Sequence, residues 1–156
     1  GLMLIWVCDL IIASEDATFS DPVVAFGVNG VEYFGHPWEF GARKAKEMLF
    51  TGGVMSAREA RSLGMVNHVV PREELEEFTM SLAERISSRP TVGLRLAKQS
   101  VNQAQDAQGL WTALQSAMSL QQLGHSNNAE LFGRTIDPSG VDVIRSDAKG
   151  DAWDVG

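Results

Sequence analysis

A carboxylic acid and an imidazole stand four residues apart in the segment NGVEYFGHP, which spans residues 29–37. They are Glu32 and His36, and both side-chain types serve widely as general acids and bases. An imidazole has an ordinary pKa of about 6.5, which suits it to proton transfer at neutral pH. We therefore predict Glu32 as a catalytic acid or base, and His36 as a second base or the partner that orients Glu32. The alternative is that both are solvated loop residues.

Other side chains are weaker candidates for a role in catalysis or ligand binding. Tyr33, Phe34 and Trp38 add aromatic surface that could line a pocket, although aromatic side chains at such positions more often pack into a core. Asp21 precedes Pro22 and is interpreted as a turn residue. His68 fits the polar position of a strand and His125 lies near an expected helix end, so neither spacing predicts a metal site.

Composition limits the classes of partner. The chain has 156 residues, is 44% hydrophobic and carries a net charge of −7. One globular domain with a real core is expected, and no run of Lys or Arg forms the basic stripe that nucleic acid or an anionic membrane needs. The glycines do not spell G-x-G-x-x-G and no Walker motif is present, so we predict no nucleotide cofactor.

The first residues form an apolar run that is too short for the roughly 20 residues of a membrane helix. It also lacks the basic start and the cleavage site of a signal peptide. We expect the chain to be a fragment without its N-terminal part. The single cysteine, Cys8, lies in this run and cannot form an internal disulfide, so we predict a small buried hydrophobe and a cytoplasmic location.

Hydrophobic spacing predicts an alternation of short strands and helices that ends in a helical region. Ser56 and Glu59 have the spacing of a helix-capping box, and Gly52 and Gly53 stop the preceding helix. The expected strands are residues 9–13, 18–20 and 65–70. The expected helices are residues 1–7, 37–50, 56–63, 72–87, 91–105 and 106–123, with a loop at 27–35 and an irregular tail at 137–156.

Three segments occur in the order in which they occur in the crotonase (enoyl-CoA hydratase/isomerase) superfamily: CDLIIASEDATFSDP (8–22), KAKEMLFTGGVMSAREARSLGMVNHVVP (44–71) and RPTVGLRLAKQSVN (89–102). The chain resembles the C-terminal portion of this superfamily. The resemblance implies an α/β fold with part of a crotonase-like ββα spiral core in residues 1–70. Helices for oligomerisation would follow in 71–136, before the irregular tail of 137–156.

The resemblance also implies a site. It places Gly1 beside the glycine whose amide is one of the family's two oxyanion-hole donors, and it places Met3 and Val23 where the two family glutamates stand. Neither Met3 nor Val23 can transfer a proton, so ordinary hydration by that pair is disfavoured. Isomerisation is easier to sustain, because one mobile base at Glu32 could shuttle a proton. The predicted substrate-binding residues are Gly1, Met3, Val23, Tyr33 and Trp38.

The function that the resemblance implies is enoyl-CoA hydratase or isomerase chemistry on an acyl-CoA or enoyl-CoA thioester, as in fatty acid metabolism. An oxyanion hole would stabilise an enolate, and no cofactor is implied beyond the coenzyme A of the substrate. Decarboxylation, thioester hydrolysis and idle acyl-CoA binding remain alternatives. The resemblance further implies a homotrimer or hexamer, with candidate contacts along the last expected helix that are equally compatible with intrachain core: Leu110, Trp111, Leu114, Met118 and Leu123.

Overall fold

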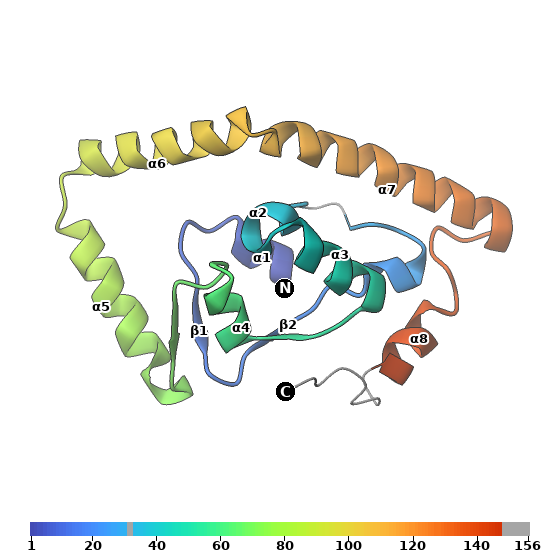
Figure 1. Ribbon diagram of the computed structural model, residues 1–156, viewed down its shortest axis with the longest axis horizontal. Coiled ribbons are helices and arrows are strands. Elements are labelled where there is room, and N and C mark those ends of the chain that lie inside the picture. Colours follow the sequence, from blue (N-terminus) through green and yellow to red (C-terminus); the bar gives the residue numbers. More distant parts are fainter. Residues whose placement is uncertain (31–32, 148–156) are drawn as a thin grey trace.

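The computed structural model describes residues 1–30 and 33–147. A small α/β core lies at the centre, and three long helices follow one another as an arc around it (Figure 1). These are α5 (Leu75–Ser87), α6 (Thr91–Ala107) and α7 (Leu110–Phe132). A last helix, α8 (Gly140–Asp147), returns to the core side of α7.

Two small sheets form the core. Strand β1 (Ile12–Ser14) pairs in parallel with β4 (His68–Val70), and β2 (Thr18–Phe19) pairs antiparallel with β3 (Met55–Ser56). The strand predicted at 18–20 is confirmed, whereas β1 begins three residues later than predicted. The Ile11 amide donates to the side-chain Oδ1 of Asn67 at 2.8 Å, so a side chain takes the place of a strand partner there.

Four short helices complete the core: α1 (Leu2–Trp6), α2 (His36–Phe40), α3 (Ala42–Thr51) and α4 (Ala57–Ser62). The single helix predicted at 37–50 is divided at Gly41, whose φ of 80° and ψ of 154° break the helix. Gly52 ends α3 as predicted. Packed together in the interior are Trp6, Ala13, Phe40, Ala45, Met48, Met55, Ala57, Ala60, Met65 and Val66.

Three predictions need correction. Cys8 is exposed, because the chain leaves the core after Trp6 and runs over the surface through Leu10. The described part of the predicted irregular tail, residues 137–147, contains helix α8, and residues 148–156 lie outside the described residues. The first residue of α8, Gly140, packs so closely on the core that an added Cβ would lie 2.5 Å from the Phe26 ring. The predicted helix 106–123 starts later and extends to Phe132 as α7.

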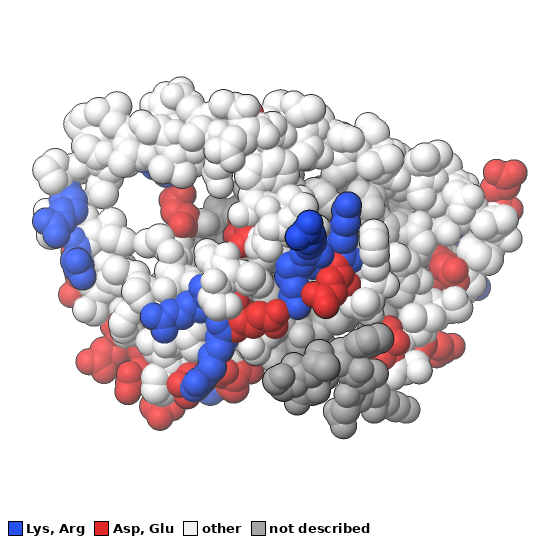
Figure 2. Space-filling model, viewed as in Figure 1, with Lys and Arg blue, Asp and Glu red and all other residues white. Residues whose placement is uncertain are grey.

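Acidic and basic side chains alternate over the surface of the core (Figure 2). Lys44 lies 2.7 Å from Glu59, and Arg58 lies 3.0 Å from Glu15. The arc is attached to the start of the core by a further exposed pair, with Lys98 Nζ 2.6 Å from the Asp9 carboxylate. Exposed pairs of this kind contribute at most about 1 kcal/mol each, so apolar packing dominates the fold.

The predicted cap of α4 gives a direct test of the local structure. Ser56 Oγ accepts a hydrogen bond from the Glu59 amide at 3.2 Å, whereas the Glu59 carboxylate pairs with Lys44. We predict that Ser56→Ala lowers the free energy of unfolding by about 1 kcal/mol, because the amide loses its acceptor. Urea denaturation measures this. Ser62→Ala, which removes a hydroxyl bonded only within the same helix, is the control, and equal losses would contradict the capping role.

Candidate functional site

The two positions implied by the resemblance, Met3 and Val23, come together at a single backbone position. Gly30 has a φ of 78°, and a Cβ added there would lie 3.0 Å from Met3 Cε and 3.2 Å from Val23 Cγ2. The same point lies 3.5 Å from Oδ2 of Asp21. The loop that carries Gly30 is therefore seated on a small surface made by α1 and by the chain on either side of Pro22.

Asp21 is paired with His36 in the interior. The His36 Nε2 lies 2.8 Å from Asp21 Oδ2, and the exposed fractions of the two side chains are 0% and 6%. The interpretation of Asp21 as a turn residue is incomplete, and the alternative of a solvated His36 is wrong. The one signal in the sequence was that Asp21 stands two residues before Val23, and nothing there links it to His36.

Aromatic rings enclose the imidazole of His36. Trp6 lies edge-on with ring centroids 4.6 Å apart, Phe34 lies at 4.8 Å and Phe40 at 6.0 Å. Within residues 1–30 and 33–147, the buried atoms His36 Nδ1 and Trp6 Nε1 have no hydrogen-bond partner. The imidazole is thus oriented by one polar contact, the one to Asp21, in surroundings where an unpaired polar group is costly.

Helix α7 holds the Gly30 loop in place. Its buried Gln121 accepts hydrogen bonds through Oε1 from the amides of Asn29 at 3.1 Å and Gly30 at 3.0 Å. Asn128 donates to the Phe26 carbonyl at 2.9 Å. Gly124 lets the helix come close, because a Cβ there would lie 2.8 Å from the Gly27 carbonyl oxygen. The site is therefore built from the N-terminal core and from α7, which lie far apart in the sequence.

His125 lies inside α7 rather than near its end, and it orients Gln121. Its Nδ1 lies 2.6 Å from the Thr135 carbonyl oxygen, and its Nε2 lies 3.1 Å from Gln121 Nε2. A carbonyl can only accept, so Nδ1 carries the proton and Nε2 accepts from the Gln121 amide. This arrangement turns the amide oxygen of Gln121 toward the loop. His125 has a structural role in the site that the sequence did not indicate.

The predicted site residues divide into several groups. Glu32 lies outside the described residues. Tyr33 packs partly buried against the core, and Trp38 is half-buried on α2. Gly1 is exposed as the residue before α1, with its carbonyl accepting from the Leu4 amide at 3.0 Å. The structure thus joins Met3, Val23 and His36 but leaves Gly1 at the surface.

Glu39 is an acid that sequence reasoning missed. It lies in the first turn of α2, half-buried, and desolvation raises the pKa of its carboxyl to about 7. Burial, followed by the charges of Glu39 and Asp106, also raises the pKa of the nearby Tyr33 hydroxyl. A carboxyl group with a pKa near neutrality is suited to acid or base chemistry.

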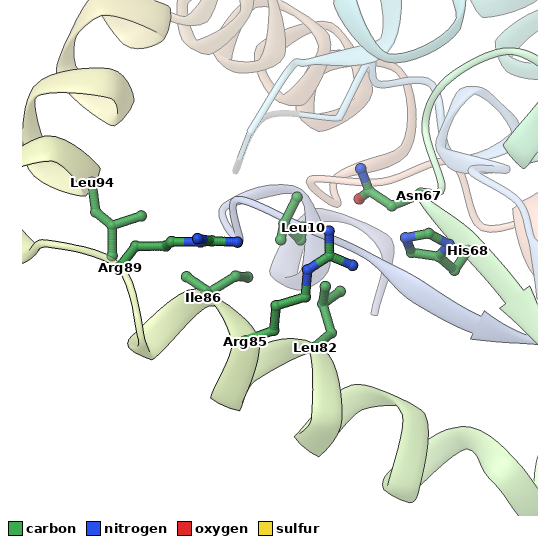
Figure 3. A pocket seen from close by; sticks show the side chains of 8 residues that line it. All are labelled: Leu10, Asn67, His68, Leu82, Arg85, Ile86, Arg89 and Leu94. Atoms are coloured by element: carbon green, nitrogen blue, oxygen red, sulfur yellow. The ribbon is translucent and has the colours of Figure 1, made fainter.

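A groove lies apart from this site, between α5 and the pair of strands β1 and β4, where Figure 2 shows the molecule hollowed beside the arc. Its volume is about 470 Å³, and Arg85 and Arg89 extend into it from α5 and its end (Figure 3). None of the predicted site residues lines it. The lining consists of Leu10, Asn67, His68, Leu82, Arg85, Ile86, Arg89 and Leu94.

The described residues form neither a membrane-spanning helix nor a cluster of metal ligands. Helices of residues 1–30 and 33–147 are all too short or too polar to cross a membrane. Over the same ranges, His, Cys, Asp and Glu nowhere gather in a group of three that could hold a metal ion.

The crotonase-like order of segments agrees with comparisons to known proteins. The family model "Enoyl-CoA hydratase/isomerase" matches residues 1–135. The chain belongs to the enoyl-CoA hydratase/isomerase family, and the expected crotonase superfamily membership is confirmed. A crystal structure of a "probable ENOYL-COA Hydratase" from Mycobacterium smegmatis superposes with a TM-score of 0.85 at 53% identity, which confirms the α/β crotonase-like fold.

The relatives are considerably longer than the matched region. The "Putative enoyl-CoA hydratase EchA13" of Mycobacterium tuberculosis is 52% identical over 134 residues, which are 85% of this chain and 42% of that protein. The Mycobacterium smegmatis match covers 87% of this chain and 55% of that one. "Methylmalonyl-CoA decarboxylase" of Escherichia coli is 36% identical over 100 residues, which are 63% of this chain and 38% of that protein. This chain therefore spans about half the length of its relatives.

The close approach at Gly30 leads to a stability prediction. Gly30→Ala should destabilise the protein more than Gly64→Ala, by about 1–2 kcal/mol. Both glycines have a positive φ, but a Cβ at Gly30 meets Met3 and Val23, whereas a Cβ at Gly64 meets nothing within 4 Å. Paired urea denaturation curves measure the difference. Equal losses would show that the loop is not seated on Met3 and Val23.

The raised pKa of Glu39 predicts a pH-dependent difference between wild type and Glu39→Gln. The pKa of Glu39 is higher in the folded chain than its ordinary value of 4.5, so protonation of Glu39 favours the folded state. This contribution to stability is fully present below about pH 4.5 and is lost as the pH rises through about 7. We expect Glu39→Gln to be the more stable at pH 8, by about 1 kcal/mol after allowance for solvent, or about 2–4 °C in Tm. Thermal unfolding at pH 5 and pH 8 measures it. The exposed Glu130→Gln is the control, and parallel curves for Glu39→Gln and wild type would contradict the prediction.

Proposed function

We propose that this chain acts on an acyl-CoA or enoyl-CoA thioester by forming an enolate whose oxygen is held in an oxyanion hole, without the usual pair of glutamates. The observation that carries the proposal is the meeting of Met3 and Val23 at Gly30, beside a buried carboxylate. In this reading, Gly1 stands next to one oxyanion donor, and removing one such donor costs about 10²–10³-fold in rate.

The apolar pair limits the reaction. Hydration needs one group to activate water and another to protonate carbon, and general acid and base groups contribute about 10²–10⁴-fold each. Methionine and valine side chains can do neither. Isomerisation of a double bond needs only one group that removes a proton and returns it elsewhere. It is therefore the reaction we propose first. The sequence predicts Glu32 and His36 as candidates for the proton transfer, and a further candidate is the buried Asp21 that pairs with His36.

Decarboxylation is the second candidate, and the same apolar pair favours it. When a carboxylate α to a thioester leaves as CO₂, the electron pair of the broken C–C bond forms the enolate, so no base is needed. The similarity to the Escherichia coli methylmalonyl-CoA decarboxylase supports considering this reaction. Idle binding of acyl-CoA, or support of an active partner subunit, is the reading that remains if neither reaction occurs.

We also propose that copies of this chain associate as a trimer or a pair of trimers. Large apolar side chains remain exposed on α6 and α7, and exposed apolar side chains on helices are typical of subunit contacts. Leu110 is buried within the chain and so is not part of that surface. The exposed residues include Val92, Leu96, Val101, Trp111, Met118, Leu120 and Leu123.

A comparison of three substrates tests the function. We would give the chain a 3-enoyl-CoA, a 2-enoyl-CoA and a 2-carboxyacyl-CoA of the same chain length, and follow the products by mass spectrometry. Calorimetry with the saturated acyl-CoA measures binding separately. We expect conversion of the 3-enoyl to the 2-enoyl thioester, and little hydration of the latter because the glutamate pair is missing.

Each other outcome has a defined meaning. CO₂ release from the 2-carboxyacyl thioester alone would replace isomerisation by decarboxylation. Rapid hydration would contradict the argument from Met3 and Val23. Binding without any product would favour the idle binder, and neither binding nor product would overturn the proposal.

A further inference from the structure

The buried carboxylate of Asp21 lies beside the two positions that the resemblance assigns to glutamates. A Cβ added at Gly30 would lie 3.5 Å from Asp21 Oδ2, 3.0 Å from the terminal methyl of Met3 and 3.2 Å from a methyl of Val23. The two implied glutamate positions thus bracket a carboxylate that comes from a third position. A carboxylate is therefore present next to Met3 and Val23, although neither of these residues supplies one.

His36 fixes the direction of that carboxylate. Its Nε2 lies 2.8 Å from Asp21 Oδ2, and rings of Trp6, Phe34 and Phe40 hold the imidazole plane. In the described part of the chain the other ring nitrogen, Nδ1, has no hydrogen-bond partner although it is buried. Among the described residues, the hydrogen bond of the imidazole is therefore to Asp21.

Stability is a weak explanation for this pair. Moving a carboxylate and an imidazole out of water costs several kcal/mol, and apolar replacements of such pairs are often neutral or stabilising. Here the pair also leaves one nitrogen unsatisfied in an aromatic enclosure, which adds to the cost. A buried polar atom without a hydrogen-bond partner calls for an explanation in a native structure, and a catalytic role is one such explanation.

We propose that Asp21 is the catalytic base that removes and returns the α-proton of the acyl-CoA thioester, with His36 as the positioning residue that holds its carboxylate. This rests on the proposed function. In the step, the Cα–H bond breaks, its proton moves to the Asp21 carboxylate, and its electron pair delocalises onto the thioester oxygen as the enolate. Return of the proton to carbon restores the carboxylate, so no other reactant is consumed.

Hydrogen exchange at the α-carbon isolates this step. We would incubate the chain with butyryl-CoA in D₂O and measure deuterium in the acyl group by mass spectrometry, with calorimetry for binding. Asp21→Asn should lower the exchange rate at least about 100-fold, while the Kd for butyryl-CoA changes by less than about threefold. The matched control is Asp9→Asn, an exposed acid paired with Lys98, which should exchange as wild type does.

Two further measurements separate catalysis from structure. In Asp21→Ala, added acetate should restore exchange, whereas acetamide, which has the same shape but is not a base, should not. His36→Gln keeps an N–H donor for Asp21 and should retain most of the exchange, whereas His36→Leu should lose at least about tenfold. A role in packing alone would favour Leu over Gln at this apolar position.

The outcomes for the inference and for the proposed function differ. Wild-type exchange that persists in folded Asp21→Asn would overturn Asp21 as the base and leave the proposed function standing. Equal rescue by acetate and acetamide would reduce Asp21 to a structural residue. Wild type that neither binds butyryl-CoA nor exchanges its protons would overturn the proposed function, and binding without exchange would overturn the enolate step together with the role of Asp21.

Discussion

Two backbone amides bonded to one side-chain oxygen determine the geometry of the site. Asn29 and Gly30 lie in a loop outside any described helix or strand. Their N–H groups therefore need acceptors other than those of a regular secondary-structure ladder. Gln121 supplies one oxygen for both, at 3.1 and 3.0 Å. Since Gln121 lies on α7, the position of the loop depends on a helix that is about ninety residues away in the sequence.

The orientation of Gln121 depends in turn on a polar network around α7. His125 donates to the Thr135 carbonyl and accepts from the Gln121 side-chain amide. This fixes which end of the Gln121 side chain faces the loop, so its oxygen points toward Asn29 and Gly30. Asn128 binds the Phe26 carbonyl, and Gly124 removes the side chain that would hold the helix away. Networks of this kind rigidify a structure when each member is satisfied. Helix α7 of the outer arc is therefore part of the site.

The site combines two opposite environments. Met3 and Val23 give it apolar surface at the two positions that the resemblance assigns to glutamates, and the Asp21–His36 pair lies beside that surface. In the proposed reaction, an enolate oxygen would gain from donors in a water-poor site, because electrostatic interactions are stronger there. A base in the same site is effective only if its position is fixed. The aromatic rings packed around His36 hold the imidazole that pairs with Asp21.

The sequence alone determined the features that depend on local order. The cap at Ser56, the helix stop at Gly52 and the family follow from residues close in the chain, and the structure and comparisons confirm them. The tertiary structure decided the rest: the Asp21–His36 pair joins residues fifteen positions apart through the packing of α2. Burial likewise set the pKa of Glu39, and contact with Phe26 fixed the start of α8. Desolvation and long-range contact depend on what surrounds a residue in space, which spacing along a chain does not encode.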